Sequence, residues 1–236
     1  DDNRITKILK KIHRPVVTYG LQSAADFSAR ELEYDWFRSS YDCYERGQFL
    51  GRIELPIPGQ HNVLNCLAAV AMGRTLNIPF EGIRRSLEKF RGVERRLQWK
   101  GEKRGVWVVD DYAHHPTEIR TALEACRTAR RRTVVLFQPH RYSRTKHLMK
   151  EISQSFGRAD LLYLMDIYPA GEEPIPGVNS EQLAQEISQY QPVIHLSKRQ
   201  DLLESLERET LEGDLLLTLG AGNVWEIGEE FLEKST

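Results

Sequence analysis

Histidine, arginine, aspartate and tyrosine residues gather in two short stretches of this sequence, residues 110–116 and 138–145. The first reads Asp-Asp-Tyr-Ala-His-His-Pro and the second reads Gln-Pro-His-Arg-Tyr-Ser-Arg-Thr. Guanidinium groups bind carboxylates and phosphates through paired hydrogen bonds. Loops rich in such residues carry binding and catalytic groups more often than loops that are merely solvated, so the two stretches favour a functional site.

Each stretch directly follows an apolar run that reads as a buried strand. Two more runs of this kind are followed by Asp-Ile-Tyr-Pro-Ala-Gly-Glu and by Gly-Ala-Gly-Asn. The strand candidates and the loops after them are 106–109 with 110–116, 133–137 with 138–145, 161–165 with 166–172, and 215–219 with 220–223. Because open α/β sheets bind ligands beyond the carboxyl ends of their strands, we expect these loops at one edge of a sheet.

Each signal also has a simpler interpretation. His114 and His115 are only weak evidence for a metal site, because adjacent side chains point in different directions and no third ligand is spaced beside them. Arg141 and Arg144 precede or begin a helix, whose N–H groups would help to bind an anion, but solvated arginines at a helix start remain the alternative. The glycines of residues 220–223 suit a tight turn equally well.

The elements that position these loops change in character near residue 93. After it, strands alternate with amphipathic helices, which predicts an α/β fold with a mostly parallel sheet and helices on both faces. Those helices are expected at 117–130, 145–156, 180–190, 200–208 and 224–232, with a further strand at 193–196. Residues 1–92 instead predict an α+β region, with strands at 16–19, 27–37 and 41–55 and helices at 62–76 and 80–90.

Two asparagines begin the first strong helix of this α+β region. Asn62 has the residue type and position of an N-cap, whereas Asn65 lies one turn further and is harder to explain as a cap. Two amides on one side of a helix start can read the donor and acceptor pattern of a purine. Considered alone, the residues favour the cap over the purine site.

Composition excludes several classes of protein. The 236 residues carry a net charge of −1, and no single-sign field indicates a nucleic acid or a membrane as partner. Cys43, Cys66 and Cys126 lack metal-type spacing, which favours reduced thiols in a cytoplasm over disulfides. No apolar run is long enough to span a bilayer. The chain opens at Asp1 without a methionine, so we expect a fragment of a longer protein.

Longer strings at these loops resemble the Mur ligases. The strings are GQHNVLNCLAAVA from residue 59, GVERR from 92, VDDYAHHPTE from 109, FQPHRYSRT from 137, DIYPAGEEPIPG from 166 and TLGAGN from 218. They extend over nearly the whole chain. Those from residue 109 onwards are similar in particular to the family member that joins L-alanine to UDP-N-acetylmuramate. The resemblance implies the end of a central ATPase domain at 1–92 and a C-terminal Rossmann-like domain at 93–236.

The same resemblance implies an ADP-forming ligase whose partners are ATP, UDP-N-acetylmuramate and L-alanine. It implies ATP contacts from Asn62, Asn65, Arg96 and Asp111. It implies that Tyr112, His114, His140, Arg141 and Arg144 line the side of the alanine and the sugar nucleotide, with His114, His140 and Arg141 as the catalytic candidates. A neutral histidine is an attractive base for the attacking amine, but the sequence does not say which one serves.

The chain departs from the family pattern in one respect. It contains no G-x-x-x-x-G-K-[ST] phosphate loop and lacks the magnesium ligands of the family, so we expect the Mg²⁺ of ATP to be held elsewhere and the chain alone to be inactive. Two alternatives remain: the related ligase that recycles a tripeptide, and a non-catalytic module that binds a nucleotide or a cell-wall precursor. A dinucleotide-dependent oxidoreductase is disfavoured, because no G-x-G-x-x-G turn follows the strand at 106–109.

Overall fold

The computed structural model describes residues 3–9, 11–22 and 24–233. The chain divides into two compact units, residues 1–92 and residues 93–236, and each has its own sheet and buried core. The predicted α/β fold class is confirmed.

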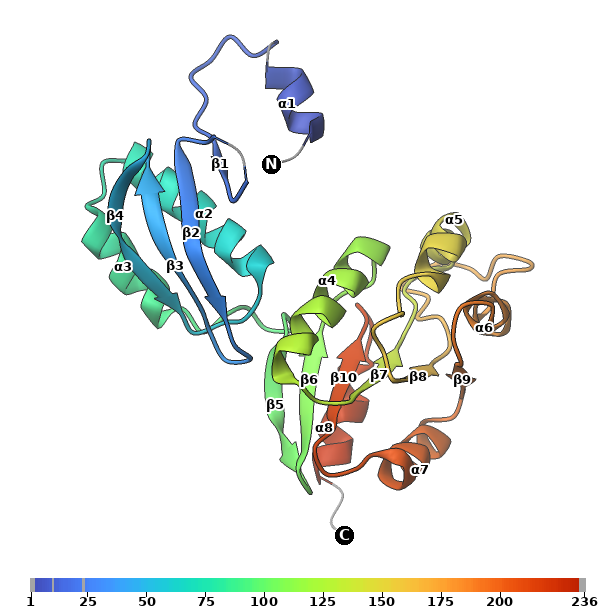
Figure 1. Cartoon of the computed structure of the whole chain (residues 1–236). Coiled ribbons are helices and arrows are strands. Elements are labelled where there is room, and N and C mark those ends of the chain that lie inside the picture. Colours follow the sequence, from blue (N-terminus) through green and yellow to red (C-terminus); the bar gives the residue numbers. More distant parts are fainter. Residues whose placement is uncertain (1–2, 10, 23, 234–236) are drawn as a thin grey trace. The chain divides into compact units, whose positions relative to one another are not determined.

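The first unit is a four-stranded sheet with two helices packed on it (Figure 1). Its elements are α1 (Asn3–Leu9), β1 (Tyr19–Gly20), β2 (Phe27–Tyr34), β3 (Ser39–Glu45), β4 (Gln48–Leu55), α2 (Gln60–Thr75) and α3 (Phe80–Lys89). The sheet order is β1-β2-β3-β4, with β1 parallel to β2 and the other neighbours antiparallel. Val63, Leu67 and Val70 recur at helical spacing on α2 and are fully buried against the strands.

Sequence and structure differ at several points in this unit. The strand predicted at 16–19 is reduced to Tyr19–Gly20, and α1 was not predicted. The N-cap prediction for Asn62 is wrong, because α2 already begins at Gln60 and Gly59 occupies the cap position with φ 99°. Two prolines at 56 and 58 precede this glycine, and its positive φ lets the chain turn directly into the helix.

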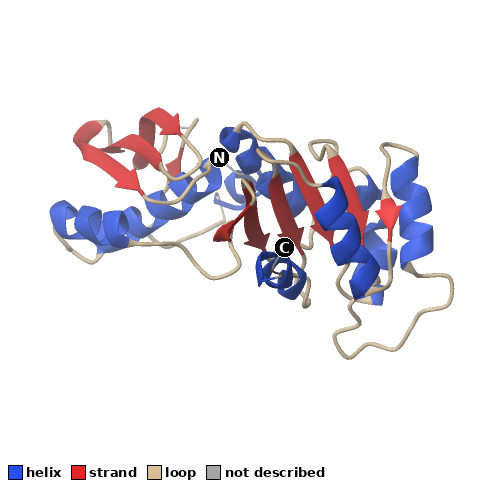
Figure 2. Cartoon of the chain, turned by 90° about the horizontal axis from the view of Figure 1, so that it is seen from below, coloured by secondary structure: helices blue, strands red, loops and turns tan. Residues whose placement is uncertain are grey.

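The second unit is a six-stranded sheet with helices on both faces (Figure 2). Its elements are β5 (Gln98–Lys103), β6 (Val106–Asp111), α4 (Pro116–Cys126), a 3₁₀ turn (Arg127–Ala129), β7 (Thr133–Phe137), α5 (Tyr142–Ser153), β8 (Leu161–Leu164), α6 (Ser180–Ser188), β9 (Ile194–His195), α7 (Arg199–Glu209), β10 (Leu215–Leu219) and α8 (Trp225–Glu233). The order is β5-β6-β10-β7-β8-β9, and every pair except β5–β6 is parallel.

The apolar runs of β7 and β10 are buried at every position, as expected for central strands covered on two faces. One face packs on leucines of α7 and on α8, where Ile227 and Phe231 are buried. The antiparallel edge strand β5 was not predicted. Its sequence, QWKGEK, is polar and is interrupted by a bulge at Gly101, so it lacks the pattern that marks a strand.

Among the described residues, no helix combines the length and the apolar character that crossing a bilayer requires. The three cysteines are free and buried.

Candidate functional site

The carboxyl ends of β6, β10, β7 and β8 lie side by side in the second unit. In register, Leu219 pairs with Asp111 on one side and with Phe137 on the other, and Phe137 pairs in turn with Leu164. The four loops singled out in the sequence all begin at these positions. The prediction that they share one edge of the sheet is therefore confirmed.

Arg95, which was not among the predicted site residues, connects two of these loops to the start of the unit. Its Nε donates to Oδ2 of Asp110 at 2.9 Å, and its Nη atoms donate to the carbonyls of Gly222 and Gly220 at 3.0 and 2.6 Å. The guanidinium also lies 5.0 Å from the centre of the Tyr112 ring. Asp110 is 1% exposed, so this is a largely buried ion pair that fixes the start of the unit to its sheet edge. The string GVERR identified this segment as similar to the family, but only the fold shows which of its two arginines makes these contacts.

Asp111 holds the same segment through the main chain. Its carboxylate oxygens accept the N–H groups of Leu97 and Ala113, both at 2.8 Å. The side chain is 6% exposed, and burial raises its pKa to about 6 although both hydrogen bonds favour the ionised form. Asp111 thus fixes the backbone of Leu97 and Ala113 directly, and the ATP contact that the resemblance implies for Asp111 stays a prediction.

The two adjacent histidines have separate tasks. His115 caps α4: its Nδ1 accepts the N–H of Thr117 at 3.3 Å, and Glu118 completes a capping box. The Glu118 carboxylate accepts the N–H groups of both His114 and His115, at 3.1 and 3.2 Å. The His114 ring does not cap the helix: its Nδ1 lies 2.9 Å from the carbonyl oxygen of Tyr112 and 3.6 Å from the Glu118 carboxylate.

His140 is positioned by the loop after β8. A parallel bridge joins His140 to Tyr168, through Arg141 N–H to Tyr168 O and Tyr168 N–H to Pro139 O, both 2.8 Å. The two rings stack with an interplanar angle of 8° and centres 5.7 Å apart. Arg144, in the first turn of α5, places Nη1 2.9 Å from Nδ1 of His140. The ring is therefore held on its face by Tyr168 and at one nitrogen by Arg144.

The site residues of three loops form one row of rings. Tyr112 meets His114 edge to face at 5.4 Å, His114 meets His140 at 5.7 Å, and His140 stacks on Tyr168. Such a row fixes each ring through its neighbours, so that the polar atoms are preorganised before any ligand binds. Tyr168 was not among the predicted site residues. Its loop was recognised, but nothing in the sequence indicated the stack.

The start of α5 differs from the anion site expected there. Glu172, from the loop after β8, accepts the backbone N–H groups of Ser143 and Tyr142 and the Ser143 hydroxyl. Hydrogen bonds from Ser143 lower the pKa of the Glu172 carboxyl. A carboxylate of the chain therefore already occupies the helix N-terminus. The expectation that these N–H groups serve a bound anion is wrong, and only the arginine side chains remain for that purpose.

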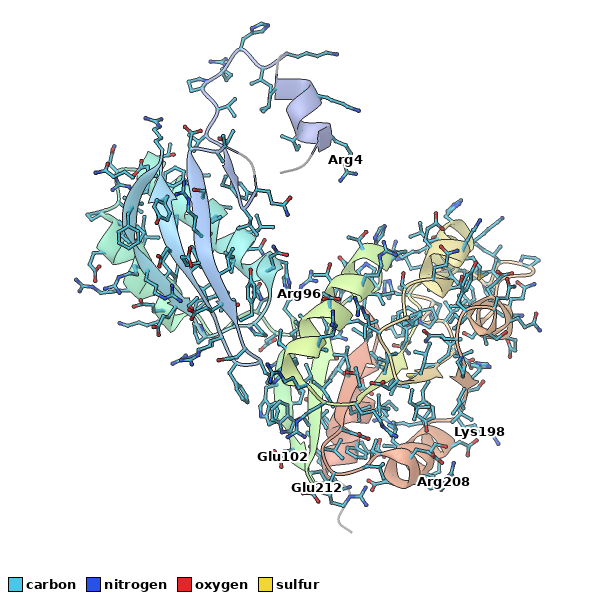
Figure 3. All side chains as sticks on the ribbon, in the orientation of Figure 1. Arg4, Arg96, Glu102, Lys198, Arg208 and Glu212 are labelled. Atoms are coloured by element: carbon cyan, nitrogen blue, oxygen red, sulfur yellow. The ribbon has the colours of Figure 1, made fainter. Side chains whose placement is uncertain are left out.

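Arg141 is strained and exposed. Its φ is +71°, a left-handed conformation that is costly for a residue with a side chain and that concentrates at functional sites. Within the described part of the chain, neither Arg141 nor Arg96 makes a salt bridge or a side-chain hydrogen bond (Figure 3 labels Arg96 at the start of the unit). Other surface arginines of this unit by contrast pair with glutamates, such as Arg104 with Glu207, Arg127 with Glu124 and Arg199 with Glu226. The edge thus keeps two unpaired guanidinium groups.

This excess positive charge affects both histidines. Burial lowers the pKa of His140 to about 4, and the charges of Arg144 and Arg141 contribute in the same direction. Burial also lowers the pKa of His114, helped by Arg144 and Arg96 and opposed by Tyr112 O and Glu118. Both rings are consequently neutral at pH 7.

Glycines bring the last loop close to the row of rings. A Cβ on Gly222 would lie 2.3 Å from Oε1 of Gln138 and 2.6 Å from Cγ of Tyr168. Gln138 is buried, donates to Asn223 and accepts the N–H of Val224 at 3.1 Å. Gly222 therefore packs closely against Gln138 and Tyr168. The glycine allows this close packing in addition to the tight turn that the sequence suggested.

The two asparagines of the first unit are placed differently from each other. Asn62 donates through Nδ2 to the carbonyl of Pro58 at 2.7 Å, which stabilises the turn before α2. Asn65 is exposed, and its amide has no hydrogen-bond partner among the described residues. Of the two asparagines, Asn65 is therefore the one that presents an unoccupied amide.

Among residues 3–9, 11–22 and 24–233, no group of three or more histidines, cysteines, aspartates or glutamates is arranged to hold a metal ion. His114 and His115 in particular make different contacts, one to a carbonyl and one to a helix N–H.

Comparison with known proteins places this geometry in a family. The model of the Mur ligase glutamate ligase domain matches residues 95–222, and that of the Mur ligase middle domain matches residues 1–73. A UDP-N-acetylmuramate–L-alanine ligase of Geobacter sp. (strain M21) is 47% identical over 98% of this chain and 51% of its own length. A ligase of the same name from Trichlorobacter lovleyi is 45% identical over 99% of this chain and 52% of its own.

Solved structures agree. UDP-N-acetylmuramate–alanine ligase from Thermotoga maritima superposes with a TM-score of 0.77 at 25% identity, covering 92% of this chain and 47% of that one. A murein peptide ligase from Psychrobacter arcticus shares the fold, with a TM-score of 0.64 at 22% identity over 91% of this chain and 45% of that one. The chain spans about half the length of the curated relatives it matches. Family model, relatives and folds together show that this chain belongs to the Mur ligases.

Proposed function

We propose that the chain is part of an ATP-dependent ligase that joins L-alanine to UDP-N-acetylmuramate, in the synthesis of a peptidoglycan precursor. The relatives named above carry that name at 45–47% identity over nearly the whole chain. The murein peptide ligase supports only a common fold, so the tripeptide-recycling activity stays second. We assign residues 1–92 to the end of the central ATP-binding domain, residues 93–236 to the C-terminal domain, and the protein to the cytoplasm.

One observation carries this proposal. Arg141 is exposed, unpaired and strained, and its charge acts on the neutral His140, whose ring is followed in the row by the neutral His114. An acyl-transfer reaction with an amino acid needs a cation for the carboxylate or for an anionic intermediate, and a neutral group beside the amine. We therefore place L-alanine and the sugar nucleotide along Tyr112, His114, His140, Arg141 and Arg144.

The reaction proposed is the one common to acyl phosphates. ATP phosphorylates the lactyl carboxylate of UDP-N-acetylmuramate, and the amine of L-alanine attacks the acyl phosphate with release of phosphate. The chain's own contribution is to hold the amino acid in place and to neutralise the negative charge that develops on oxygen.

ATP contacts are proposed for Asn62, Asn65, Arg96 and Asp111. The free amide of Asn65 and the unpaired guanidinium of Arg96 support this proposal, whereas Asn62 and Asp111 are already hydrogen-bonded to the main chain. The described residues form no magnesium site, so no step is assigned to the metal.

The test uses a complete ligase that contains these two units. It should release phosphate from ATP when UDP-N-acetylmuramate and L-alanine are both present, and mass spectrometry should identify the L-alanyl product. A preference for the L-alanyl-γ-D-glutamyl-diaminopimelate tripeptide over L-alanine would support the recycling activity instead. The 236-residue chain alone should show no turnover in the same assay. Binding without any turnover by the complete protein would favour the non-catalytic module.

A further inference from the structure

Each histidine of the site has Nδ1 bound to a partner that can play only one part in a hydrogen bond. Neutral imidazole carries one proton, on either Nδ1 or Nε2, and the partner of one nitrogen decides which. Both rings are neutral at pH 7, so the partners of Nδ1 fix the tautomers.

For His140 the partner of Nδ1 is a donor. Arg144 places Nη1 at 2.9 Å from Nδ1, and a guanidinium donates but never accepts. Nδ1 must therefore offer its lone pair, and the proton resides on Nε2. His140 presents an N–H group to its surroundings and no basic nitrogen.

For His114 the partner of Nδ1 is an acceptor. The carbonyl oxygen of Tyr112 lies at 2.9 Å and can only accept, so Nδ1 carries the proton. The carboxylate of Glu118, 3.6 Å from the same nitrogen, favours the proton there as well. Nε2 of His114 is therefore left with a lone pair.

We propose that the two histidines are held in opposite tautomers and so divide the chemistry, with Nε2 of His114 as the proton acceptor for the substrate amine and Nε2–H of His140 as a donor to an anionic oxygen. The assignment of tautomers rests on the contacts that Nδ1 of the two neutral rings makes with Arg144, Tyr112 and Glu118. The assignment of roles rests in addition on the proposed function.

The step balances as follows. The ammonium group of the amino acid gives one proton to Nε2 of His114, and the freed lone pair forms a bond to the acyl carbon. The carbonyl oxygen becomes negative and accepts the N–H of His140. As the carbonyl re-forms, the C–O bond to phosphate breaks, phosphate leaves with the electron pair, and the second amine proton leaves with it as the amide forms.

The charges around the rings suit this division. Arg96 and Arg144 face His114, opposed by Glu118, whereas Arg144 and Arg141 face His140, opposed by Glu172. Burial, helped by two cations beside each ring, keeps both rings neutral, so that a lone pair and an N–H group are available at the same pH. The same cations favour the neutral form of a bound amine over its ammonium.

The tautomers are measured directly in the 236-residue chain. Long-range ¹H–¹⁵N correlation spectra of ¹⁵N-histidine-labelled protein at pH 7 distinguish the two forms, and His114→Gln and His140→Gln spectra assign the signals. We expect an Nε2–H pattern for His140 and an Nδ1–H pattern for His114. The same tautomer at both residues, or averaged signals at either, overturns the proposal.

A matched pair of variants separates the hydrogen bond from the charge. Arg144→Met removes both, and we expect His140 to lose its Nε2–H pattern and to titrate at a higher pH. Arg141→Met removes only a nearby charge, so the pKa of His140 should rise while its tautomer stays. Backbone spectra confirm that both variants fold. A tautomer that survives Arg144→Met shows that Arg144 does not set it.

The roles are tested in the complete ligase. His114→Gln should lose at least about 100-fold in kcat together with the acid limb of its pH profile, because a general base contributes about 10²–10⁴-fold. His140→Leu should lose roughly 100-fold with the limb retained, as for other oxyanion donors, and His140→Gln should recover at least tenfold of that through its amide N–H. An acid limb that vanishes with His140→Gln instead overturns the roles. If the unaltered ligase forms no L-alanyl product, the proposed function fails while the spectra still decide the tautomers.

Discussion

In the second unit, most of the candidate side chains are held in place by contacts with their neighbours. Arg95 joins Asp110 to two glycine carbonyls, Tyr168 stacks on His140, and Arg144 binds the same ring. In the first unit, Asn65 stands exposed on α2 without a hydrogen-bond partner among the described residues. Groups that take part in bond making must be fixed before the ligand arrives, because their geometry sets the rate. A group that only recognises a ligand can stay exposed to solvent until the ligand binds, and its removal should weaken binding alone.

The largest expected effect is therefore structural, at Arg95. Arg95→Ala leaves Asp110 buried without its partner, which costs about 3–5 kcal/mol for a pair of this kind. Chemical denaturation of the chain measures the loss in the transition of the second unit. Arg127→Ala is the matched control, since its pair with Glu124 is more than half exposed and contributes less than about 1 kcal/mol. Equal losses of unfolding free energy for the two substitutions would show that the buried Arg95 pair contributes no more than the exposed Arg127 pair.

Arg141 is the opposite of Arg95, because it is exposed and makes no ion pair among the described residues of the same site. Arg141→Ala in the complete ligase should lower kcat/KM by about 100-fold or more, since a charge-assisted contact in a closed site contributes roughly 3 kcal/mol. The unfolding free energy of the chain should not fall, because Arg141 makes no salt bridge among the described residues and has a strained backbone. A stable variant with nearly normal kinetics would remove Arg141 from the site.

Gly222 tests whether the packing beneath Tyr168 matters. Gly222→Ala places a Cβ within 2.3 Å of Gln138 Oε1 and 2.6 Å of Tyr168 Cγ, so this packing must open at a cost of about 1–3 kcal/mol. Thermal unfolding measures the loss, and the His140 signals should shift with Tyr168. Gly157→Ala is the control, because its Cβ would meet nothing within 4 Å. A fall in thermal stability no larger than that of the control would show that the packing around Gly222 adjusts to the added methyl group.

His140 predicts a smaller effect that depends on pH. Its folded pKa of about 4 lies below the ordinary histidine value, so the neutral ring contributes stability that is present above pH ~6.5 and is lost as the pH falls towards 4. The unfolding free energy of the chain, compared with that of His140→Gln between pH 7 and 4, isolates this contribution. Parallel curves for the two proteins would mean that His140 titrates normally in the folded chain.

Asn65 should give the smallest effect. Asn65→Ala removes an exposed amide, so the unfolding free energy should change by less than about 0.5 kcal/mol. In the complete ligase, the KM for ATP should rise and the preference for ATP over GTP should narrow. Lower stability with an unchanged nucleotide preference would mean that Asn65 has a structural role. Asn65 would then no longer differ in kind from the residues of the second unit that neighbouring side chains hold in place.

Local patterns in the sequence were enough to predict the alternation of strands and helices after residue 93 and the four polar loops. Both follow from local patterns: apolar runs of β7 and β10 form central strands, and parallel strands bring the residues that follow them to one edge. The same strings, through their resemblance, indicated the family. The edge strand β5 escaped because its residues are polar and its pairing depends on β6.

Only the tertiary structure decided what each polar residue does. Arg95 and Arg96 are neighbours of one type, yet one is tied to Asp110 and the other is exposed and unpaired. His114 and His115 likewise differ only in what the fold puts beside them, a carbonyl oxygen for one and a helix N–H for the other. Glu172 reaches the start of α5 across 29 residues of chain. Hydrogen bonds and charges between segments distant in sequence leave no local pattern, and for that reason these roles become visible only when the chain has folded.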